Sequence, residues 1–176
     1  LLDTSEGETT ADAAPAPPVV CEGAEVEAGV MWVSPYLQLA TPTSMWLHWE
    51  TEVGAESRVE WGTSGALDNV TCGEHRASWL DTSLHEVQLT GLTPDTRYDY
   101  RVKTGDLVSE VSSFVTPGDP ALEGASRFIV VSDMQIDNGN PSVWREIVEE
   151  GIIPFTTAEH GGDVADAVDI VMIPGD

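Results

Sequence analysis

Residues 44–51 read SMWLHWET, and this stretch decides the class of fold. Its apolar side chains Met45, Leu47 and Trp49 occupy every second position, which is the spacing of a β-strand that packs one face inward. The same alternation recurs in three further segments, RVEWG (58–62), LHEVQLTGL (84–92) and RYDYRVKTG (97–105). Turn-forming residues interrupt the pattern about every ten residues, which is typical of antiparallel sandwiches. We therefore predict an all-β sandwich over residues 30–117.

The composition limits the possible partners. The 176 residues suffice for one domain and part of a second. The formal net charge of −24 repels nucleic acids and anionic lipid surfaces, so we expect neither as a partner. No apolar run reaches the ~20 residues that span a bilayer, so we expect no transmembrane segment. Residues 1–29 are acidic and rich in Pro and Ala, and we expect a disordered linker there.

The compartment is suggested by the start of the chain and by its cysteines. The chain begins with Leu1 and Leu2, which is compatible with a secretory signal upstream. Cys21 and Cys72 fit either one disulfide in an oxidising compartment or two unrelated thiols. We expect a secreted, periplasmic or cell-surface protein, with the signal itself not seen.

A different pattern follows a Pro- and Gly-rich hinge at 118–126. Residues 127–135 read RFIVVSDMQ, an unbroken apolar run that predicts a strand covered on both faces in a parallel sheet. Pro141 and the helical spacing of the next apolar residues predict a helix over 141–152, closed by Gly151 and Pro154. A second apolar strand, DIVMI, follows at 169–173. We predict one strand–helix–strand unit of an α/β domain over 127–176.

Each of these two strands is followed by an aspartate, Asp133 and Asp176. The carboxyl ends of parallel strands meet at one edge of a sheet, where α/β folds place their ligands. Neighbouring strands are about 4.8 Å apart, so both carboxylates can share one cation or span two. Without a cation they would repel each other, and the pattern therefore predicts metal binding.

The sandwich segment resembles a known domain. GLTPDTRYDYRV (91–102) resembles the tyrosine corner of immunoglobulin-like sandwiches and of fibronectin type III domains. SPYLQLATPTSMWLHWET (34–51) together with VEWGTS (59–64) resembles the N-terminal domain of purple acid phosphatases. The resemblance implies a fold and, by itself, no activity.

The second segment resembles the start of a calcineurin-like metallophosphoesterase domain. Asp-x-Gln at 133–135 and Gly-Asp at 175–176 are similar to the first two motifs of that superfamily, which contains the purple acid phosphatases. The resemblance implies that Asp133 binds the first metal and that Asp176 bridges two metal ions, namely Fe, Zn or Mn. Gln135 stands where many relatives have His and purple acid phosphatases have Gly, so its role as a ligand is tentative.

The resemblance implies acid phosphatase-like hydrolysis of phosphate esters in the complete protein. Later motifs of the superfamily are absent from these 176 residues, so we expect an incomplete N-terminal fragment that is inactive alone. The alternative is a secreted, non-catalytic fibronectin III-like binding or adhesion module. In that case Asp133 is a cap or loop residue and Asp176 an ordinary turn residue. The oligomeric state is left open.

We expect the four histidines to be exposed to solvent. We expect His48, His75 and His85 on the surface of the sandwich. His160 lies in the Gly-rich stretch AEHGGD, and we expect a solvated loop residue there.

Overall fold

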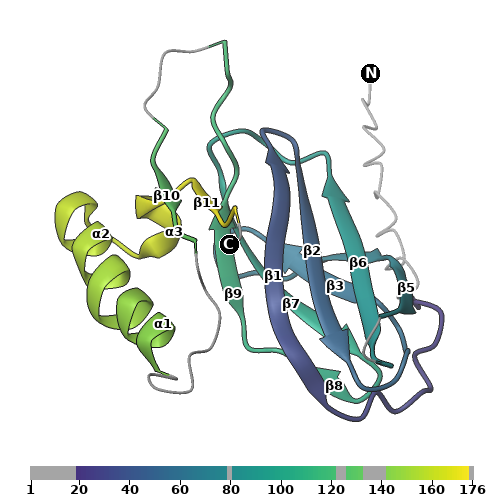
Figure 1. Ribbon diagram of the computed structural model, residues 1–176. Coiled ribbons are helices and arrows are strands. Elements are labelled where there is room, and N and C mark those ends of the chain that lie inside the picture. Colours follow the sequence, from purple (N-terminus) through teal and green to yellow (C-terminus); the bar gives the residue numbers. More distant parts are fainter. Residues whose placement is uncertain (1–18, 79–80, 122–125, 133–141, 175–176) are drawn as a thin grey trace, which may run out of the picture.

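The computed structural model describes residues 19–78, 81–121, 126–132 and 142–174. Two antiparallel sheets pack face to face, which confirms the predicted sandwich (Figure 1). One sheet has the strand order β1 (Met31–Thr41), β2 (Ser44–Thr51), β6 (Ser83–Thr90), β5 (Glu74–Ala77). The other has the order β4 (Asn69–Cys72), β3 (Arg58–Gly62), β7 (Arg97–Thr104), β8 (Leu107–Val108), and β9 (Ser112–Val115) also pairs with β7.

The core is formed by the inward faces that the alternation predicts. Leu47 and Trp49 of β2 are fully buried, and β6 places Val87 directly opposite Leu47. The Trp49 indole N–H donates to the Thr104 hydroxyl at 2.7 Å, so a buried hydrogen bond joins the two sheets. The remaining members of the cluster are Met45, Val59, Leu89, Leu92, Tyr98, Tyr100, Val102 and Phe114.

The tyrosine corner is present. The backbone N–H of Thr93 donates to the Tyr98 hydroxyl at 3.0 Å, so the ring of a core residue fixes the turn that precedes its own strand. Asp95 in that turn has a positive φ of 48°, a conformation that aspartate tolerates better than most residues. The expected corner geometry is therefore confirmed.

Two of the three sandwich histidines are buried, which makes their predicted surface position wrong. His85 is fully buried and His48 is 7% exposed, whereas His75 is exposed as predicted. His85 continues the inward series of β6 at a spacing of two and faces Trp49 across the strand pair. Its ring stacks on Trp49 at 5.0 Å, so this imidazole belongs to the core.

Hydrogen bonds make the burial of His85 tolerable. Its Nδ1 lies 2.8 Å from the Ser57 hydroxyl and its Nε2 lies 2.7 Å from the Thr51 hydroxyl. Both polar atoms of the ring are thus satisfied without water.

Cys21 and Cys72 form a disulfide with a Cα–Cα distance of 5.5 Å. This decides between the two alternatives that the sequence leaves open. The bond ties the segment before β1 to the end of β4. The backbone N–H of Glu56 also donates to the Gly23 carbonyl at 3.1 Å, which fastens the same segment a second time.

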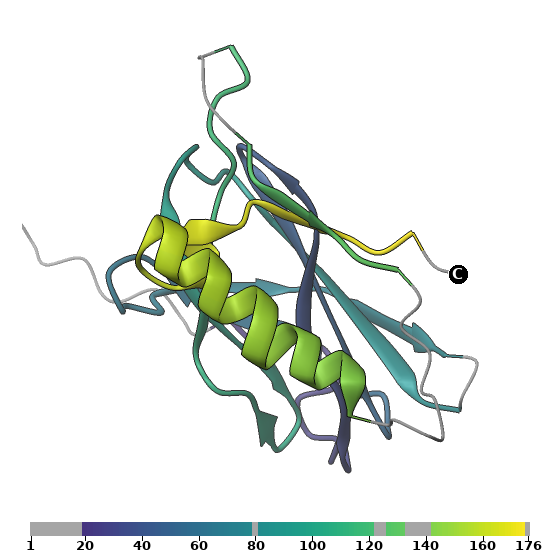
Figure 2. The same ribbon diagram turned by 60° about the vertical axis from the view of Figure 1, so that its left-hand side comes forward.

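Beyond the sandwich, β10 (Phe128–Val130) and β11 (Ile170–Met172) are parallel neighbours. Much of the described chain between them is helical (Figure 2). Its segments are α1 (Val143–Glu146), the π-helical η1 (Ile147–Ile152), α2 (Ile153–His160) and α3 (Val164–Ala167).

The predicted end of the helix at Gly151 and Pro154 is wrong. Helical structure continues through both residues to His160. Pro154 lies in the first turn of α2, where its missing N–H is least needed. The π-helical turns of η1 lie directly before Pro154 and connect α1 to α2.

The first prediction concerns the disulfide. Replacing both Cys21 and Cys72 by Ser should lower the free energy of unfolding by about 4 kcal/mol, because the bond closes a loop with a sequence separation of 51. Urea unfolding of the full chain measures this, and the reduced wild type serves as the matched control. A loss below about 1 kcal/mol in both would show that the cross-link contributes little.

The second prediction concerns His85. Burial, aided by the nearby His75, lowers the pKa of His85 from 6.5 to about 4. The unfolded chain therefore binds a proton that the folded chain does not, and stability is lost as the pH falls from about 6.5 towards 4. The loss amounts to about 3 kcal/mol.

Denaturant unfolding at several pH values tests this. His85→Gln should flatten the dependence in that window, whereas His160→Gln, at an exposed position, should leave it unchanged. An unaltered pH dependence in His85→Gln would contradict a neutral, buried imidazole at this position.

Candidate functional site

The carboxyl ends of β10 and β11 lie side by side, as the predicted metal site requires. The strands pair in parallel, and the backbone N–H of Val131 donates to the carbonyl of Met172 at 3.0 Å. The chain segments that lead to the two aspartates are therefore brought together. The predicted ligands themselves, Asp133, Gln135 and Asp176, lie outside the described residues.

No competing metal site is found in the part of the chain that the structure describes. Within residues 19–78, 81–121, 126–132 and 142–174, no group of three or more His, Cys, Asp or Glu side chains is placed to hold a metal ion. The prediction of a metal centre therefore continues to rest on Asp133 and Asp176.

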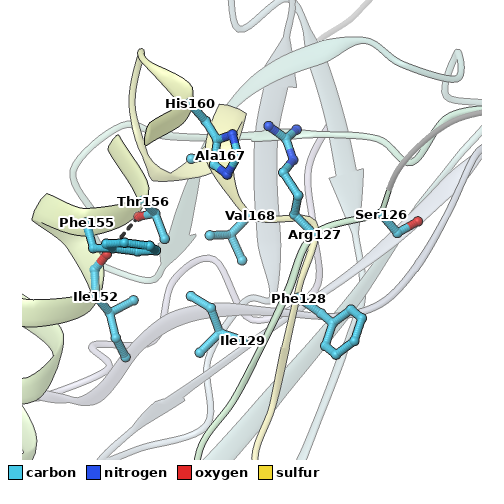
Figure 3. Close-up of a pocket in the computed structure, with 10 residues that line it drawn as sticks. All are labelled: Ser126, Arg127, Phe128, Ile129, Ile152, Phe155, Thr156, His160, Ala167 and Val168. Atoms are coloured by element: carbon cyan, nitrogen blue, oxygen red, sulfur yellow. Dashed lines mark hydrogen bonds between the residues drawn. The ribbon is translucent and has the colours of Figure 1, made fainter. Parts of the chain in front are cut away.

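A hollow of about 370 Å³ lies between β10 and the helical segments (Figure 3). In Figure 3, Ile152 and Phe155 of the helices face Ile129 and Val168 on the strand side. The remaining lining residues are Ser126, Arg127, Phe128, Thr156, His160 and Ala167. An apolar hollow of this kind is a packing interface that the described residues fill incompletely.

His160 lies at the rim of this hollow. It is exposed, as predicted, but it ends α2 and is not part of a loop. The Thr156 hydroxyl, one turn earlier, donates to the Ile152 carbonyl at 2.8 Å (Figure 3). Among the described residues, His160 belongs to no group of three or more side chains that could hold a metal ion.

The opposite face of the parallel pair is open, which corrects the prediction of a strand covered on both sides. Phe128 borders the hollow, but its ring is 61% exposed and lies on the side of β10 away from the helices (Figure 3). Val130 lies on the same face and is 55% exposed. Their partners on β11, Ile170 and Met172, are 46% and 45% exposed. Among the described residues, only one face of β10 has helices against it. So large an apolar surface is unusual for a finished domain.

Every basic side chain of the chain already has an acidic partner. The seven Lys and Arg residues all lie within 4.0 Å of a carboxylate oxygen. The pairs are Arg58–Glu60, Arg76–Glu86, Arg97–Asp163, Arg101–Glu60, Lys103–Glu56, Arg127–Asp169 and Arg145–Glu149. Among the described residues, no Lys or Arg side chain is therefore without a carboxylate partner.

One of these pairs joins the sandwich to the helical segment. Arg97 of β7 donates to both oxygens of Asp163 at 3.2 Å and also to Asp166 of α3. Its hydrogen bonds with Asp163 and Asp166 raise the pKa of Arg97 above its ordinary value. Arg97 also donates to the Ser113 hydroxyl of β9. Arg97 therefore forms a polar link between the sandwich and the helical segment.

Sequence reasoning missed this link. Asp163 and Asp166 are three residues apart and follow two glycines. This spacing predicts two carboxylates on the same side of the start of a helix. Their partner is 66 residues earlier in the chain, and local pattern cannot identify it.

Comparisons with known proteins give one family and one curated relative. Residues 27–116 match the family model described as "Purple acid Phosphatase, N-terminal domain". An acid phosphatase from Aspergillus ficuum is 29% identical over 146 residues, which cover 73% of this chain and 24% of the relative. The chain thus spans about a quarter of the length of the curated relative that it matches.

Solved structures show weaker likenesses. The sensor domain of the anti-sigma factor RsgI4 from Pseudobacteroides cellulosolvens has a TM-score of 0.39 and 16% identity, covering 55% of this chain and 96% of that one. A structure of PhoD has a TM-score of 0.43 and 20% identity, covering 68% of this chain and 24% of that one. Both TM-scores are below 0.5, so neither likeness supports an argument about function.

The third prediction concerns Arg97. Arg97→Gln should release α3 from the sandwich and lower the amide-exchange protection of Val168, whose N–H bonds to Val164, by about threefold to tenfold. Raised salt should produce part of the same effect in the wild type. Protection in the core strand β6 should not change.

Arg145→Gln is the matched control, because Arg145 pairs only with Glu149 on the same exposed helix among the described contacts. Equal protection of Val168 in the wild type and in Arg97→Gln would show that apolar packing alone holds α3 in place.

Proposed function

The chain belongs to the purple acid phosphatase N-terminal domain family, and from this membership we propose that the protein is a metal-dependent phosphoesterase. It would hydrolyse phosphate esters at a dinuclear metal site in a second domain that begins near residue 127. The observation that carries the proposal is the order of parts. The family domain is followed by two parallel strands whose carboxyl ends lead to Asp133 and Asp176.

The similarity to an acid phosphatase supports a relationship beyond the sandwich. The alignment with the Aspergillus ficuum protein covers 73% of this chain, which is more than residues 27–116 alone supply. Part of residues 117–176 or of the N-terminal segment must therefore contribute to the match. This favours a shared arrangement of sandwich and following segment.

We take the ligands from the resemblance of Asp133, Gln135 and Asp176 to the first two metallophosphoesterase motifs. Asp133 would bind the first metal and Asp176 would bridge both, and Gln135 is a further candidate for the first site. Carboxylate and amide oxygens are hard donors that suit Mn and Fe ions and are acceptable to Zn. When bound, two such ions polarise the phosphoryl group and lower the pKa of a bound water to about 7. The ion identities, whether Fe, Zn or Mn, are not assigned.

Charge supports a metal centre as well. A phosphate ester is an anion, and the chain carries a formal net charge of −24. Its seven basic residues are all engaged with carboxylates. An anionic substrate therefore needs cations that these basic side chains do not supply, and carboxylates such as Asp133 and Asp176 are suited to hold them.

The open apolar face of β10 and β11 supports a larger second domain. Phe128, Val130 and Met172 expose surface on one face that further secondary structure would cover. We propose a linker at 1–29, a fibronectin III-like domain at 30–117, a hinge at 118–126 and the start of a calcineurin-like phosphoesterase domain at 127–176. These 176 residues alone should be inactive, because the remaining metal ligands come from the rest of that domain.

The location follows from the disulfide. A Cys21–Cys72 bond persists in oxidising compartments, so we propose a secreted, periplasmic or cell-surface protein. In the described part of the chain, no helix combines the length and the apolar character needed to cross a membrane.

A second candidate function is a non-catalytic binding module. The observation that favours it is a stack of three rings on the face of β2 that points away from the core. His48 lies between Tyr36 and Trp46, with ring centroids 5.5 and 5.9 Å apart. Aromatic clusters outside a core commonly contact partners.

The fourth prediction tests the metal-dependent activity. A protein extended through a complete second domain should bind about two metal ions per chain and hydrolyse aryl phosphates, nucleotides or diesters. Asp176→Asn should lower metal content and reduce activity at least about 100-fold. Asp133→Asn should do the same through the first metal.

Asp119→Asn is the matched control, since this hinge carboxylate only accepts the Ala121 N–H among the described contacts and should leave both readouts unchanged. An extended protein that binds no metal, or that binds two and fails on all three substrate classes, would overturn the proposal. Binding of a polysaccharide or protein partner by residues 30–117 alone would then support the second candidate.

A further inference from the structure

An exposed asparagine begins the edge strand β4, in the sequence Asn69-Val70-Thr71. We propose that Asn69 is a site of N-glycosylation and carries an N-linked oligosaccharide. The inference does not depend on the phosphatase activity, because none of the proposed metal ligands takes part in it.

The sequence meets the chemical requirement for this modification at one position. The acceptor is an Asn followed two residues later by Ser or Thr, with any residue except Pro between them. Asn69 satisfies this rule, with Val70 in the middle. Asn138 is followed by Gly139 and Asn140, and Asn140 by Pro141 and Ser142, so neither qualifies.

The side chain of Asn69 is accessible, and one of its two amide hydrogens makes no hydrogen bond among the described contacts. It is exposed, and its Nδ2 donates to the Trp61 carbonyl at 3.2 Å. An amide nitrogen carries two hydrogens, and only one is used in this bond. A sugar can replace the other hydrogen while the bond to Trp61 persists. Asp68, directly before it, is exposed as well, so the approach is open on that side.

The place in the fold also suits a bulky group. In its sheet, β4 pairs with β3 and forms the end of the strand order, so its outer edge has no strand beside it among the described residues. An open edge with free backbone groups is a site of unwanted strand pairing, which proteins commonly block. A solvated glycan at the start of this strand would hinder such pairing.

The folded structure implies that the sugar is attached before the hairpin closes. Thr71 supplies the hydroxyl that the acceptor rule requires, but in the fold this hydroxyl accepts the Trp61 indole N–H at 2.9 Å. Cys72, the next residue, is bound to Cys21. Both contacts hold the acceptor segment in an extended strand, so the transfer precedes the pairing of β3 with β4 and the formation of the disulfide.

The transfer is balanced with one co-reactant, an oligosaccharide linked to a lipid pyrophosphate. The bond from the anomeric carbon of the sugar to the pyrophosphate oxygen breaks, and a bond from that carbon to Asn69 Nδ2 forms. The amide nitrogen gives up one proton, and the lipid pyrophosphate leaves. No oxidant or reductant is involved. The donor belongs to secretory membranes, in keeping with the oxidising compartment that the disulfide requires.

The fifth prediction concerns the modification of Asn69, which is measured in one tryptic peptide. Trypsin cleaves after Arg58 and Arg76 and releases residues 59–76, in which Asn69 is the single asparagine. The mature protein from the cells that make it is reduced, digested and treated with peptide N-glycosidase in ¹⁸O-water. We expect Asn69 to be converted to ¹⁸O-labelled Asp in most copies. An unlabelled, unmodified peptide would overturn the proposal.

Variants secreted from a glycosylating host provide the controls. Thr71→Ser retains the acceptor rule and the hydroxyl and should be labelled like the wild type, whereas Thr71→Ala and Asn69→Gln should carry no glycan. A label on Asn69 in Thr71→Ala would contradict enzymatic transfer. Because peptides are analysed after denaturation, a folding defect in a variant does not hide the answer.

Discussion

The contact of Trp49 with both sheets is the interaction on which the rest of the structure depends. Its indole stacks on His85 of the neighbouring strand and donates to Thr104 of the opposite sheet. Trp49 thus combines a fully buried apolar ring with an indole N–H that has a hydrogen-bond acceptor. Both contacts hold β2 against its neighbour β6 and against β7 of the opposite sheet. β7, which carries Thr104, also carries Arg97, and Arg97 donates to Asp163 and Asp166 of the helical segment.

Charge is the second constraint. Each of the seven basic residues is committed to a structural ion pair, and the surplus of carboxylates is large. The carboxylate of Glu56 is fully buried and lies 3.2 Å from the Lys103 ammonium. A buried acidic side chain therefore also has a basic partner. In the proposed function, bound metal ions would offset this negative charge for a phosphate ester, so the ends of β10 and β11 are central to it.

The sequence predicted the sandwich well because alternation at Met45, Leu47 and Trp49 reports burial directly. It failed where the residue type misleads. His85 has the inward spacing of β6, yet histidine suggests a surface position, and Pro154 suggests a helix end although a first helical turn accepts it. Contacts between distant segments, such as Arg97 with Asp163, leave no local pattern. The proposed ligands stay predictions because they lie outside the described residues.

The most direct test of the account is a crystal structure of a protein extended through the second domain, with metals located by anomalous scattering. We predict two ions about 3.5 to 4 Å apart, beyond the carboxyl ends of β10 and β11. Asp133 should bind one ion and Asp176 should bridge both. The account would be contradicted by ions bound elsewhere, or by Asp133 and Asp176 in ordinary turns with no ion between them.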